Sequence, residues 1–524
     1  MKVPAFGAFV LALFLVTACE KKYELSADRG NAEHMVLMVW DGMRPDLVSE
    51  RNTPNLWALA QRGVFFANHH PEFPSTTEVN GTALATGMRP GRSGIIGNRE
   101  FRPALDPRKS VAMEELGTVR KDDELKHGKH IATATVAETV QQAGFRTAVA
   151  GTKPVALLQD RAEARTSKAA SESVDVFAGK SMPADAVVEL QKARGEFPPL
   201  IKFPNTAQDR WTTDMLTGGL WKNGVPKYSV LWMSDPDFSQ HATTPGAPAA
   251  LAAIRSADDM LGIVLATLKE KGVIEQTDIF VVSDHGFSTV SGTADIAQAL
   301  IDAGLRAHRT YATPPDNGDI LIVNTGATLL LYVTGHDADT IAKLVRVMQE
   351  LPSTGVVFSR EAIDGTFPLS AAGVDSPDAP DVVVAPRWNS EKNKFGVPGT
   401  LTYDGGTKLG VGMHGSLSPF DQTNTLIGAG PDFRAGWRDE LPSGNIDVAP
   451  TVLWLMGIRP LTKLDGRVLF EALRKQTTDA GRPEDKRIEA TRDLGTIRWT
   501  QYLRIVTHNG ATYLLEGNGA QTAR

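Results

Sequence analysis

The sequence predicts an α/β fold in which a mostly parallel sheet is flanked by helices. From residue 35 onward, apolar runs of strand length alternate with amphipathic stretches of helical length, which is the pattern of successive βα units. Residues 247–272 carry apolar side chains at helical spacing and end on a glycine, so they predict a long helix. Four runs are apolar enough to be buried strands: 35–40 (MVLMVW), 228–233 (YSVLWM), 278–283 (DIFVVS) and 423–430 (TNTLIGAG).

The residues before the first strand have the features of an export signal. Lys2 precedes an apolar run over 5–16, which is too short for a membrane span and has the length of a signal-peptide core. Cys19 follows small residues, as in a bacterial lipobox, and is the only cysteine, so no internal disulfide is expected. We therefore expect a signal peptide over 1–18, a lipidated Cys19 and a polar tether over 19–34, with a plain secretory signal as the alternative. The chain is then exported to the periplasmic or cell-surface face of a bacterial membrane and held there by its N-terminal lipid anchor.

The rest of the chain predicts one catalytic domain and a terminal extension. Hydrophobic residues make up 42% and charged residues 22% of the 524, which is typical of globular proteins, and the net charge is -6. No basic block stands out, so we expect no nucleic-acid-binding module. We place the catalytic domain at 35–475, with insertions at about 155–225 and 290–410 that cap the active edge of the sheet. In the extension, 476–524, residues 496–517 predict a hairpin.

Polar side chains follow three of the predicted strands at the point where each strand ends. Asp41 follows the first strand, Asp237 and His241 follow the second, and Asp284 and His285 follow the third. In open α/β sheets, functional groups collect at the carboxyl ends of the strands. We therefore expect these five side chains to converge on one edge of the sheet.

A sixth candidate, His414, lies in a glycine-flanked loop before the 423–430 strand. Three aspartates and three histidines suit two zinc ions, because zinc favours imidazole and carboxylate ligands. Each pair alone is also common as a simple hydrogen-bonded pair, so the prediction depends on their shared placement at strand ends. The other histidines show no such placement: we interpret His69 and His70 as structural, and His127 and His130 as surface residues.

The stretch 74–81 (PSTTEVNG) places three hydroxyl side chains ahead of a predicted helix. Ser75 and Glu78 fit a capping box, in which two side chains satisfy amides of the first helical turn. A hydroxyl at a helix N-terminus beside a metal also suits a nucleophile, because both favour its alkoxide form. Two metal ions about 4 Å apart clamp a phosphoryl group by stabilising the attacking and leaving oxygens. The stretch therefore predicts a helix cap, a phosphoryl-transfer nucleophile, or both.

The ordered motifs resemble the alkaline phosphatase superfamily and, within it, the type I phosphodiesterase and nucleotide pyrophosphatase family. That family carries Pro-Thr-x-Thr-Phe-Pro-Asn-His, then Thr-Gly-x-x-Pro, then Gly-Ile-Ile-x-Asn, where this chain has PSTTEVNG, ATGMRPGRSG and GIIGN. The resemblance covers most of 35–475 and implies an alkaline-phosphatase-like fold. It makes Thr77 the nucleophile, and it makes Asn98, with the Thr77 backbone amide, the group that binds a phosphoryl oxygen.

The same resemblance implies the cofactors and the reaction. One Zn²⁺ would be held by Asp41, Thr77, Asp284 and His285, and a second by Asp237, His241 and His414. The implied reaction is hydrolysis of a small-molecule phosphate ester, most readily at a phosphodiester or pyrophosphate bond, in two in-line steps through a phosphothreonine.

The chain departs from the family's pattern at Glu78 and at Val79, which stands where the family has proline, and Lys153 also bears on specificity. Glu78 stands where the family has an aromatic side chain that helps to grip a nucleobase. Lys153 falls roughly where phosphomonoesterase relatives place a basic residue, although we interpret it as a surface lysine. Two alternatives remain: a phosphomonoesterase on the same scaffold, which needs a cationic clamp for a dianionic phosphate, and a non-catalytic surface-binding lipoprotein.

Overall fold

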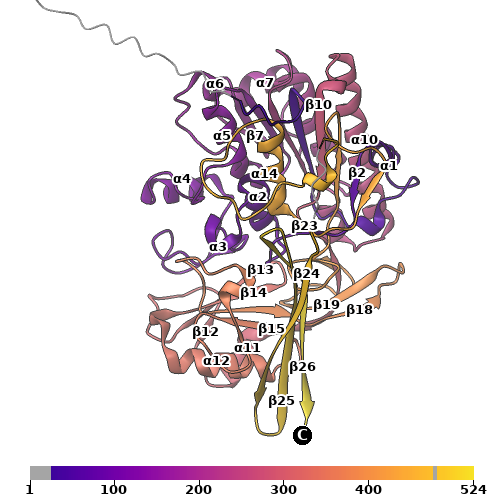
Figure 1. The fold of residues 1–524 in the computed structure, drawn as a ribbon. Helices are drawn as coiled ribbons and strands as arrows, with labels where there is room; N and C mark the ends of the chain where they lie inside the picture. Colours follow the sequence, from indigo (N-terminus) through magenta and orange to yellow (C-terminus); the bar gives the residue numbers. More distant parts are fainter. Residues whose placement is uncertain (1–24, 476–480) are drawn as a thin grey trace, which may run out of the picture.

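The structure, a computed structural model, describes residues 25–475 and 481–524. The predicted signal peptide and Cys19 lie outside the described residues. A large sheet flanked by helices forms the upper part of the molecule, and a lobe of smaller sheets lies below it (Figure 1). Among the residues that the structure describes, no helix is both long and apolar enough to cross a bilayer.

The large sheet is mixed and mostly parallel, as predicted. β1 lies at its centre between β9 and β10 and runs parallel to both, and only β21 and β8 run against the common direction. In spatial order its nine strands are β22 (Trp437–Asp439), β2 (Val64–Phe66), β21 (Leu426–Ala429), β10 (Thr277–Val282), β1 (His34–Trp40), β9 (Tyr228–Met233), β6 (Thr147–Gly151), β7 (Val174–Phe177) and β8 (Lys180–Met182).

Helices cover both faces of this sheet. The side chains of β1 alternate between two hydrophobic cores, with Leu37 and Val39 in one and Val36 and Met38 in the other. A strand buried on both faces has no polar face, which explains its continuous apolar run. The first core is covered by α2 (Thr77–Thr86), α5 (Val136–Gln142) and α14 (Asn445–Leu455), and the second by α1 (Pro54–Arg62), α8 (Thr206–Asp214) and the predicted long helix, α10 (Pro248–Glu270).

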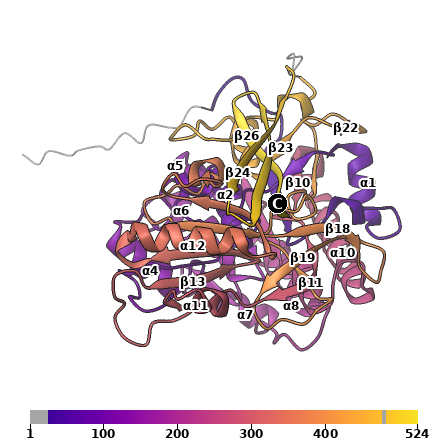
Figure 2. The same ribbon diagram turned by 90° about the horizontal axis from the view of Figure 1, so that it is seen from below.

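The predicted insertion at 290–410 corresponds to the lobe, which we define as residues 288–413. Its six-stranded sheet has the order β12 (Ala307–His308), β13 (Ile320–Thr325), β14 (Thr328–Val333), β17 (Val382–Pro386), β15 (Thr354–Ser359), β16 (Phe367–Pro368). Its four-stranded sheet has the order β18 (Trp388–Lys392), β19 (Pro398–Asp404), β11 (Ser288–Ala294), β20 (Gly412–Met413). α11 (Ile296–Asp302) and α12 (Ala338–Glu350) complete the lobe, and α12 crosses its lower face (Figure 2).

The segment 155–225 differs from the insertion that the sequence predicts. It contributes β7 and β8 to the far edge of the large sheet, followed by α7 (Ala186–Arg194) and α8. The run in β7 is only four residues long and contains Asp175, so its apolar character is too weak to mark a buried strand.

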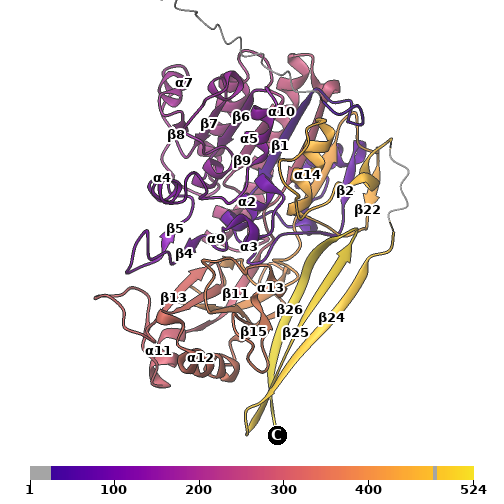
Figure 3. The ribbon, with the colours of Figure 1, turned by 60° about the vertical axis from the view of Figure 1, so that its left-hand side comes forward.

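The C-terminal extension forms a three-stranded antiparallel sheet, of which the predicted hairpin is a part. Its strands are β24 (Glu484–Asp493), β25 (Ile497–His508) and β26 (Ala511–Ala523), and they run from the main domain past the lobe (Figure 3). Gln501 exchanges hydrogen bonds with the main chain of Val357 in the lobe, and the Tyr513 hydroxyl donates to Asp447 of α14 at 2.7 Å. The extension therefore ties the lobe to the main domain.

Candidate active site

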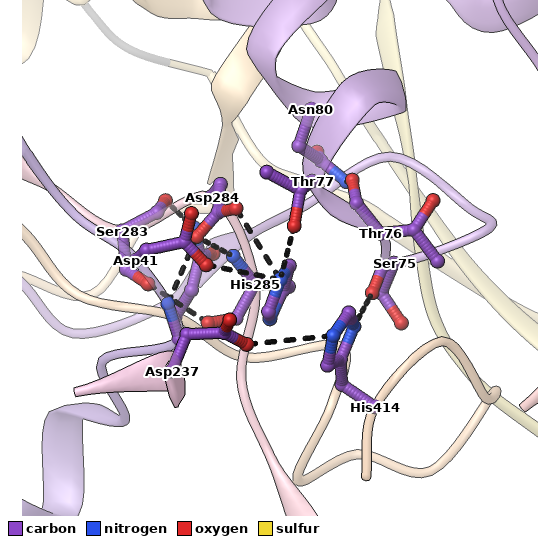
Figure 4. Close-up of polar contacts among 12 residues, drawn as sticks. Asp41, Ser75, Thr76, Thr77, Asn80, Asp237, Ser283, Asp284, His285 and His414 are labelled. Carbon is purple, nitrogen blue, oxygen red and sulfur yellow. Dashed lines mark hydrogen bonds and ion pairs between the residues drawn. The ribbon is translucent and has the colours of Figure 1, made fainter. Parts of the chain in front are cut away.

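The structure brings the predicted site residues together at one edge of the large sheet (Figure 4). Asp41 follows β1, Asp237 begins α9 (Asp237–Ala242) after β9, and Asp284 and His285 follow β10. His414 reaches the same edge because the strand after its loop, β21, is antiparallel and therefore starts there. The chain enters the lobe just after His285 and leaves it just before His414, so both connections between the lobe and the main domain lie at the site.

Each of the three aspartates has one carboxylate oxygen that is buried and has no hydrogen-bond partner. These atoms are Oδ1 of Asp41, Oδ1 of Asp237 and Oδ2 of Asp284. The opposite oxygens are held: Trp232 Nε1 donates to Asp41 Oδ2 at 2.8 Å, and the Gly42 amide donates to Asp284 Oδ1 at 2.9 Å. Buried polar atoms are normally paired, so three unpartnered oxygens at one edge point to a cation.

The three histidines are oriented in the same way as one another. The Nδ1 of each ring lies near a main-chain carbonyl oxygen, which can only accept a hydrogen bond. Each Nδ1 is therefore the protonated nitrogen, and each Nε2 keeps a lone pair. Nε2 of His241 and Nε2 of His414 lie 3.1 Å apart, so without an ion one of them must take a proton. Each Nδ1 lies near a main-chain oxygen: His241 near Gly412 at 3.2 Å, His285 near Gly286 at 3.0 Å and His414 near Ser75 at 2.9 Å.

These donor atoms form two overlapping groups whose ligand atoms lie within 4.8 Å of one another. Asp237, His241 and His414 form one group, which matches the predicted second zinc set. The other group contains Asp41, His285 and Asp237, whereas the prediction has Asp284 in place of Asp237. Asp284 Oδ2 nevertheless lies 3.3 Å from His285 Nε2. Nitrogen and carboxylate donors in this arrangement fit zinc.

Thr77 is the hydroxyl of the 74–81 stretch that contacts this cluster. It is the first residue of α2, and its Oγ1 lies 3.4 Å from His285 Nε2. The Ser75 hydroxyl instead donates to the Ser416 carbonyl at 3.1 Å, and Thr76 Oγ1 is buried without a partner. The positive end of α2 therefore lies at Thr77, where it favours an alkoxide.

The predicted capping box of Ser75 and Glu78 is wrong. The N-cap residue of α2 is Thr76, and its side chain makes no capping hydrogen bond. The Glu78 amide instead donates to Asn98 Oδ1 at 3.2 Å. Asn98, which the resemblance places in the site, therefore lies against the first turn of α2, and Glu78 is itself only 5% exposed.

Lys153 is a site residue rather than the surface lysine that the sequence predicts. Its side chain is 11% exposed, and Nζ lies 2.9 Å from Asp41 Oδ2, 3.0 Å from Asp237 Oδ2 and 3.4 Å from Thr77 Oγ1. Burial alone would lower the pKa of Lys153, but the surrounding carboxylates outweigh it and hold the pKa well above its usual value. Lys153 follows a strand end, as the predicted ligands do. The strand is β6, however, and its alanine-rich run is less apolar than the four predicted strands, so the sequence does not mark it clearly.

Three of the other histidines are buried and hydrogen-bonded away from the donor cluster, whereas His127 is exposed, as predicted. As predicted, His69 and His70 are buried, and His69 bonds Ser443 and Asn445. His130 is not the surface residue that the sequence predicts, because it is buried and lies 2.9 Å from Asp122.

The metal-free site is expected to release protons when it takes up zinc. Burial, reinforced by neighbouring carboxylates, raises the pKa of Asp41 to about 8, and burial raises the pKa of Asp284 to about 7. Below these values both groups keep protons that a cation must displace, so zinc affinity rises with pH from about 6 to 8. The folded state also holds more protons than the unfolded chain, whose Asp pKa is about 3.9, so the metal-free protein loses stability as pH rises toward these values.

Proton release is measured with an indicator dye when zinc is added at pH 6 and at pH 8. We expect more protons released per zinc at pH 6, and fewer from Asp41→Asn at that pH. Equal release at both pH values would show that these carboxyls are already ionised.

Comparison with known proteins identifies the family. A family model described as Type I phosphodiesterase / nucleotide pyrophosphatase matches residues 35–417. The chain belongs to this family. It is accordingly a hydrolase that acts on phosphoric ester or anhydride bonds.

Similar curated proteins carry related names. The chain is 20% identical to mouse bis(5'-adenosyl)-triphosphatase enpp4 over 87% of its own length and 84% of that protein. It is 23% identical to an uncharacterised pyrophosphatase/phosphodiesterase of Schizosaccharomyces pombe, over 49% of this chain and 45% of that protein. It is also 23% identical to human ectonucleotide pyrophosphatase/phosphodiesterase family member 1, over 50% of this chain and 23% of that protein. This member of the family therefore spans less than half the length of the last two relatives.

Solved structures confirm the fold. Murine ectonucleotide pyrophosphatase/phosphodiesterase 5, solved as an inactive threonine-to-alanine variant in complex with AMP, superposes with a TM-score of 0.59 at 17% identity. The match covers 84% of this chain and 100% of that chain. The human counterpart gives a TM-score of 0.55 at 16% identity. The predicted alkaline-phosphatase-like α/β fold is thereby confirmed.

Proposed function

We propose that this phosphodiesterase-family chain hydrolyses phosphodiester or pyrophosphate bonds of small-molecule phosphate esters, through a covalent phosphothreonine at Thr77 and with two zinc ions. The observation that carries the proposal is the position of Thr77 at the start of α2, 3.4 Å from His285 within the cluster of three aspartates and three histidines. The inactivity of a threonine-to-alanine variant of the murine relative supports a threonine nucleophile.

The residues around Thr77 fit two in-line displacements. In the first, Thr77 Oγ1 bonds to phosphorus while the bond from phosphorus to the leaving oxygen breaks; in the second, water bonds to phosphorus and the bond to Oγ1 breaks. The start of α2 and the Lys153 ammonium, 3.4 Å away, both stabilise a negative Oγ1. Asn98 Oδ1 accepts a hydrogen bond from the Glu78 amide. This bond orients the Asn98 carboxamide so that Nδ2 can donate to a phosphoryl oxygen.

The candidate ligands divide between two ions. Asp41, Asp284 and His285, with Thr77, would hold one zinc ion, and Asp237, His241 and His414 would hold the other. Bound there, two zinc ions would supply the charge that stabilises the attacking and leaving oxygens. The unpartnered carboxylate oxygens and the oriented imidazoles support this division.

The proposal is tested by comparing turnover of a phosphodiester, a dinucleotide polyphosphate and a phosphomonoester by the zinc-loaded chain. We expect kcat/KM for the diester or the polyphosphate to exceed that for the monoester. A chain that turns over only the monoester would overturn the assignment.

Lys153 favours phosphomonoester hydrolysis as a second candidate function. A dianionic phosphate carries one more charge than a diester, and the buried Lys153 ammonium beside Thr77 supplies a cation for it. Under this alternative Lys153→Met lowers monoester turnover far more than diester turnover. Equal losses of monoester and diester turnover would mean that Lys153 only balances the charges of Asp41 and Asp237.

Glu78 is expected to weaken binding of nucleobases. It occupies the position at which the family has an aromatic side chain, and one of its carboxylate oxygens is buried without a partner. Stacking of a base on an aromatic ring contributes about 1–3 kcal/mol. Glu78→Phe should therefore lower the KM for a nucleotide diester about tenfold, without changing it for a diester that lacks a base. An unchanged ratio of the two KM values would mean that residue 78 does not contact the base.

We also propose export and anchoring. Residues 1–18 would direct export, lipidated Cys19 would hold the chain at the membrane, and 19–34 would be the tether. The ectonucleotide names of the relatives support a position outside the cytoplasm. Metabolic labelling with palmitate should mark the wild type, and Cys19→Ala should lose both the label and membrane association.

A further inference from the structure

Asn445 is the first residue of α14, and its side chain is fully buried and has no part in the proposed reaction. Its carboxamide makes four hydrogen bonds, which is all that it can make. Nδ2 donates to Asn80 Oδ1 at 2.9 Å and to the Asp284 carbonyl at 2.8 Å. Oδ1 accepts from His69 Nε2 at 2.9 Å and from Asn424 Nδ2 at 3.1 Å. The group is therefore fixed in both position and orientation.

The hydrogen bond from Asn445 to Asn80 holds α2, the helix that carries Thr77. Asn80 lies three residues after Thr77, one turn along α2. Its Nδ2 donates to the carbonyls of Thr76 and Glu72 at 3.2 and 3.0 Å, and its Oδ1 accepts from the Glu72 amide at 2.7 Å. Asn80 thus fixes the chain on both sides of Thr77, and Asn445 holds Asn80.

The hydrogen bond from Asn445 to the Asp284 carbonyl holds the turn that carries two candidate metal ligands. The Asp284 carbonyl that accepts from Asn445 belongs to the residue whose side chain lies 3.3 Å from His285. Asn424, which donates to Asn445, also donates to the carbonyl of Ser283 in the same turn. Within the described residues, no main-chain hydrogen bond joins α2 to this turn. Apart from the contact between Thr77 and His285 itself, the Asn445 carboxamide joins them, through Asn80 on one side and the Asp284 carbonyl on the other.

We propose that Asn445 is a positioning residue that sets the distance between the Thr77 hydroxyl and the Asp284–His285 turn. The inference rests on the proposed function, because that distance matters when Thr77 attacks phosphorus beside the metal ligands. A misplacement of about 1 Å costs a reaction about 100-fold. The segments that Asn445 joins come from residues 77–86 and 283–285, far apart in the sequence, so a side-chain link has to hold them.

The test compares Asn445→Ala with Tyr513→Phe. Both remove a buried hydrogen bond to the first turn of α14, but the Tyr513 hydroxyl bonds Asp447, whose carboxylate otherwise accepts from the Gly444 and Arg467 amides. For Asn445→Ala we expect kcat to fall about 10- to 100-fold, with KM and zinc content at saturating zinc unchanged. For Tyr513→Phe we expect kcat to stay at the wild-type value. Asn445→Asp, which keeps the acceptor and replaces the donor end, should show the same loss if the alanine variant does not fold.

Amide hydrogen exchange provides a second measurement that needs no turnover. Asn445→Ala should accelerate exchange in peptides covering 74–84 and 283–287, whereas Tyr513→Phe should not. A wild-type kcat for Asn445→Ala, or equal losses in the two variants, would overturn the inference. A wild-type chain that hydrolyses no phosphate ester would contradict the proposed function alone, since hydrogen exchange still decides the role of Asn445.

Discussion

Replacing Thr77 by alanine is expected to lower turnover of a phosphodiester by about 10⁴-fold or more, in line with the loss of a covalent nucleophile in other hydrolases. The reason is geometric. Thr77 Oγ1 lies 3.4 Å from His285 Nε2 in the cluster of aspartates and histidines, whereas the Ser75 hydroxyl donates to the Ser416 carbonyl and Thr76 Oγ1 has no hydrogen-bond partner. Zinc content should stay at two equivalents, because six ligands remain. Steady-state kinetics and metal analysis on the same preparation measure both quantities.

Thr76→Val is the matched control for this substitution. Thr76 is the neighbouring threonine, is equally buried, and has a hydroxyl without a partner, so valine preserves its shape and removes no hydrogen bond. We expect turnover within about threefold of wild type, because the substitution removes a buried hydroxyl that has no hydrogen-bond partner and leaves no other polar group unpaired. If Thr76→Val abolished activity and Thr77→Ala did not, the nucleophile would be misassigned.

Asp237→Asn is expected to have the second largest effect. Asp237 belongs to both groups of clustered ligand atoms, and its Oδ1 lies 3.2 Å from His241 Nε2 and 3.5 Å from His414 Nε2. Burial would raise its pKa, but Lys153 and His241 outweigh burial and hold the pKa well below the usual value, so the group is a carboxylate at neutral pH. An amide keeps the shape and loses the charge. Zinc content should fall below two equivalents, and turnover should fall at least about 100-fold.

Asp175→Asn makes the same chemical change outside the site. Asp175 lies in β7, is fully buried, and has two carboxylate oxygens without hydrogen-bond partners. Burial raises its pKa well above the usual value, which favours the uncharged acid, and an amide has the shape of that acid. Zinc content and turnover should therefore match wild type. Full zinc loading and activity in Asp237→Asn would contradict the proposed division of ligands.

Much of the fold was predictable because the central strands are buried on both faces. Such strands appear as continuous apolar runs, so β1, β9 and β10 stand out in the sequence, and each ends shortly before Asp41, Asp237 or Asp284. β7 is short and contains a buried carboxylate, and β6 is rich in alanine, so neither was detected. Because the apolar signal of β7 is so weak, the sequence predicts an insertion over 155–225, where the structure has β7 and β8 at the edge of the sheet.

The polar connections of the site were less predictable than its ligands. Metal ligands share residue types and strand-end placement, which a sequence shows. Lys153 lies 76 positions from Thr77, and Asn445 lies 365 positions from Asn80, so the roles of both depend on contacts between distant segments. The local signal for Lys153 is only its place after the weakly apolar β6, and nothing in the local sequence marks Asn445. The capping role expected of Ser75 failed for a similar reason: the Ser416 carbonyl, 341 positions away, binds its hydroxyl, and Asn98 meets the Glu78 amide.

The central claim is that Thr77 carries the phosphoryl group between two displacements. It is tested most directly by acid-quenching the zinc-loaded wild-type chain during turnover of a diester and locating the covalent product by mass spectrometry of the peptide that contains residues 74–81. We expect a phosphoryl ester on Thr77 that is absent from Thr77→Ala and present in Thr76→Val. Turnover without any covalent product, or a product on another residue, would contradict it.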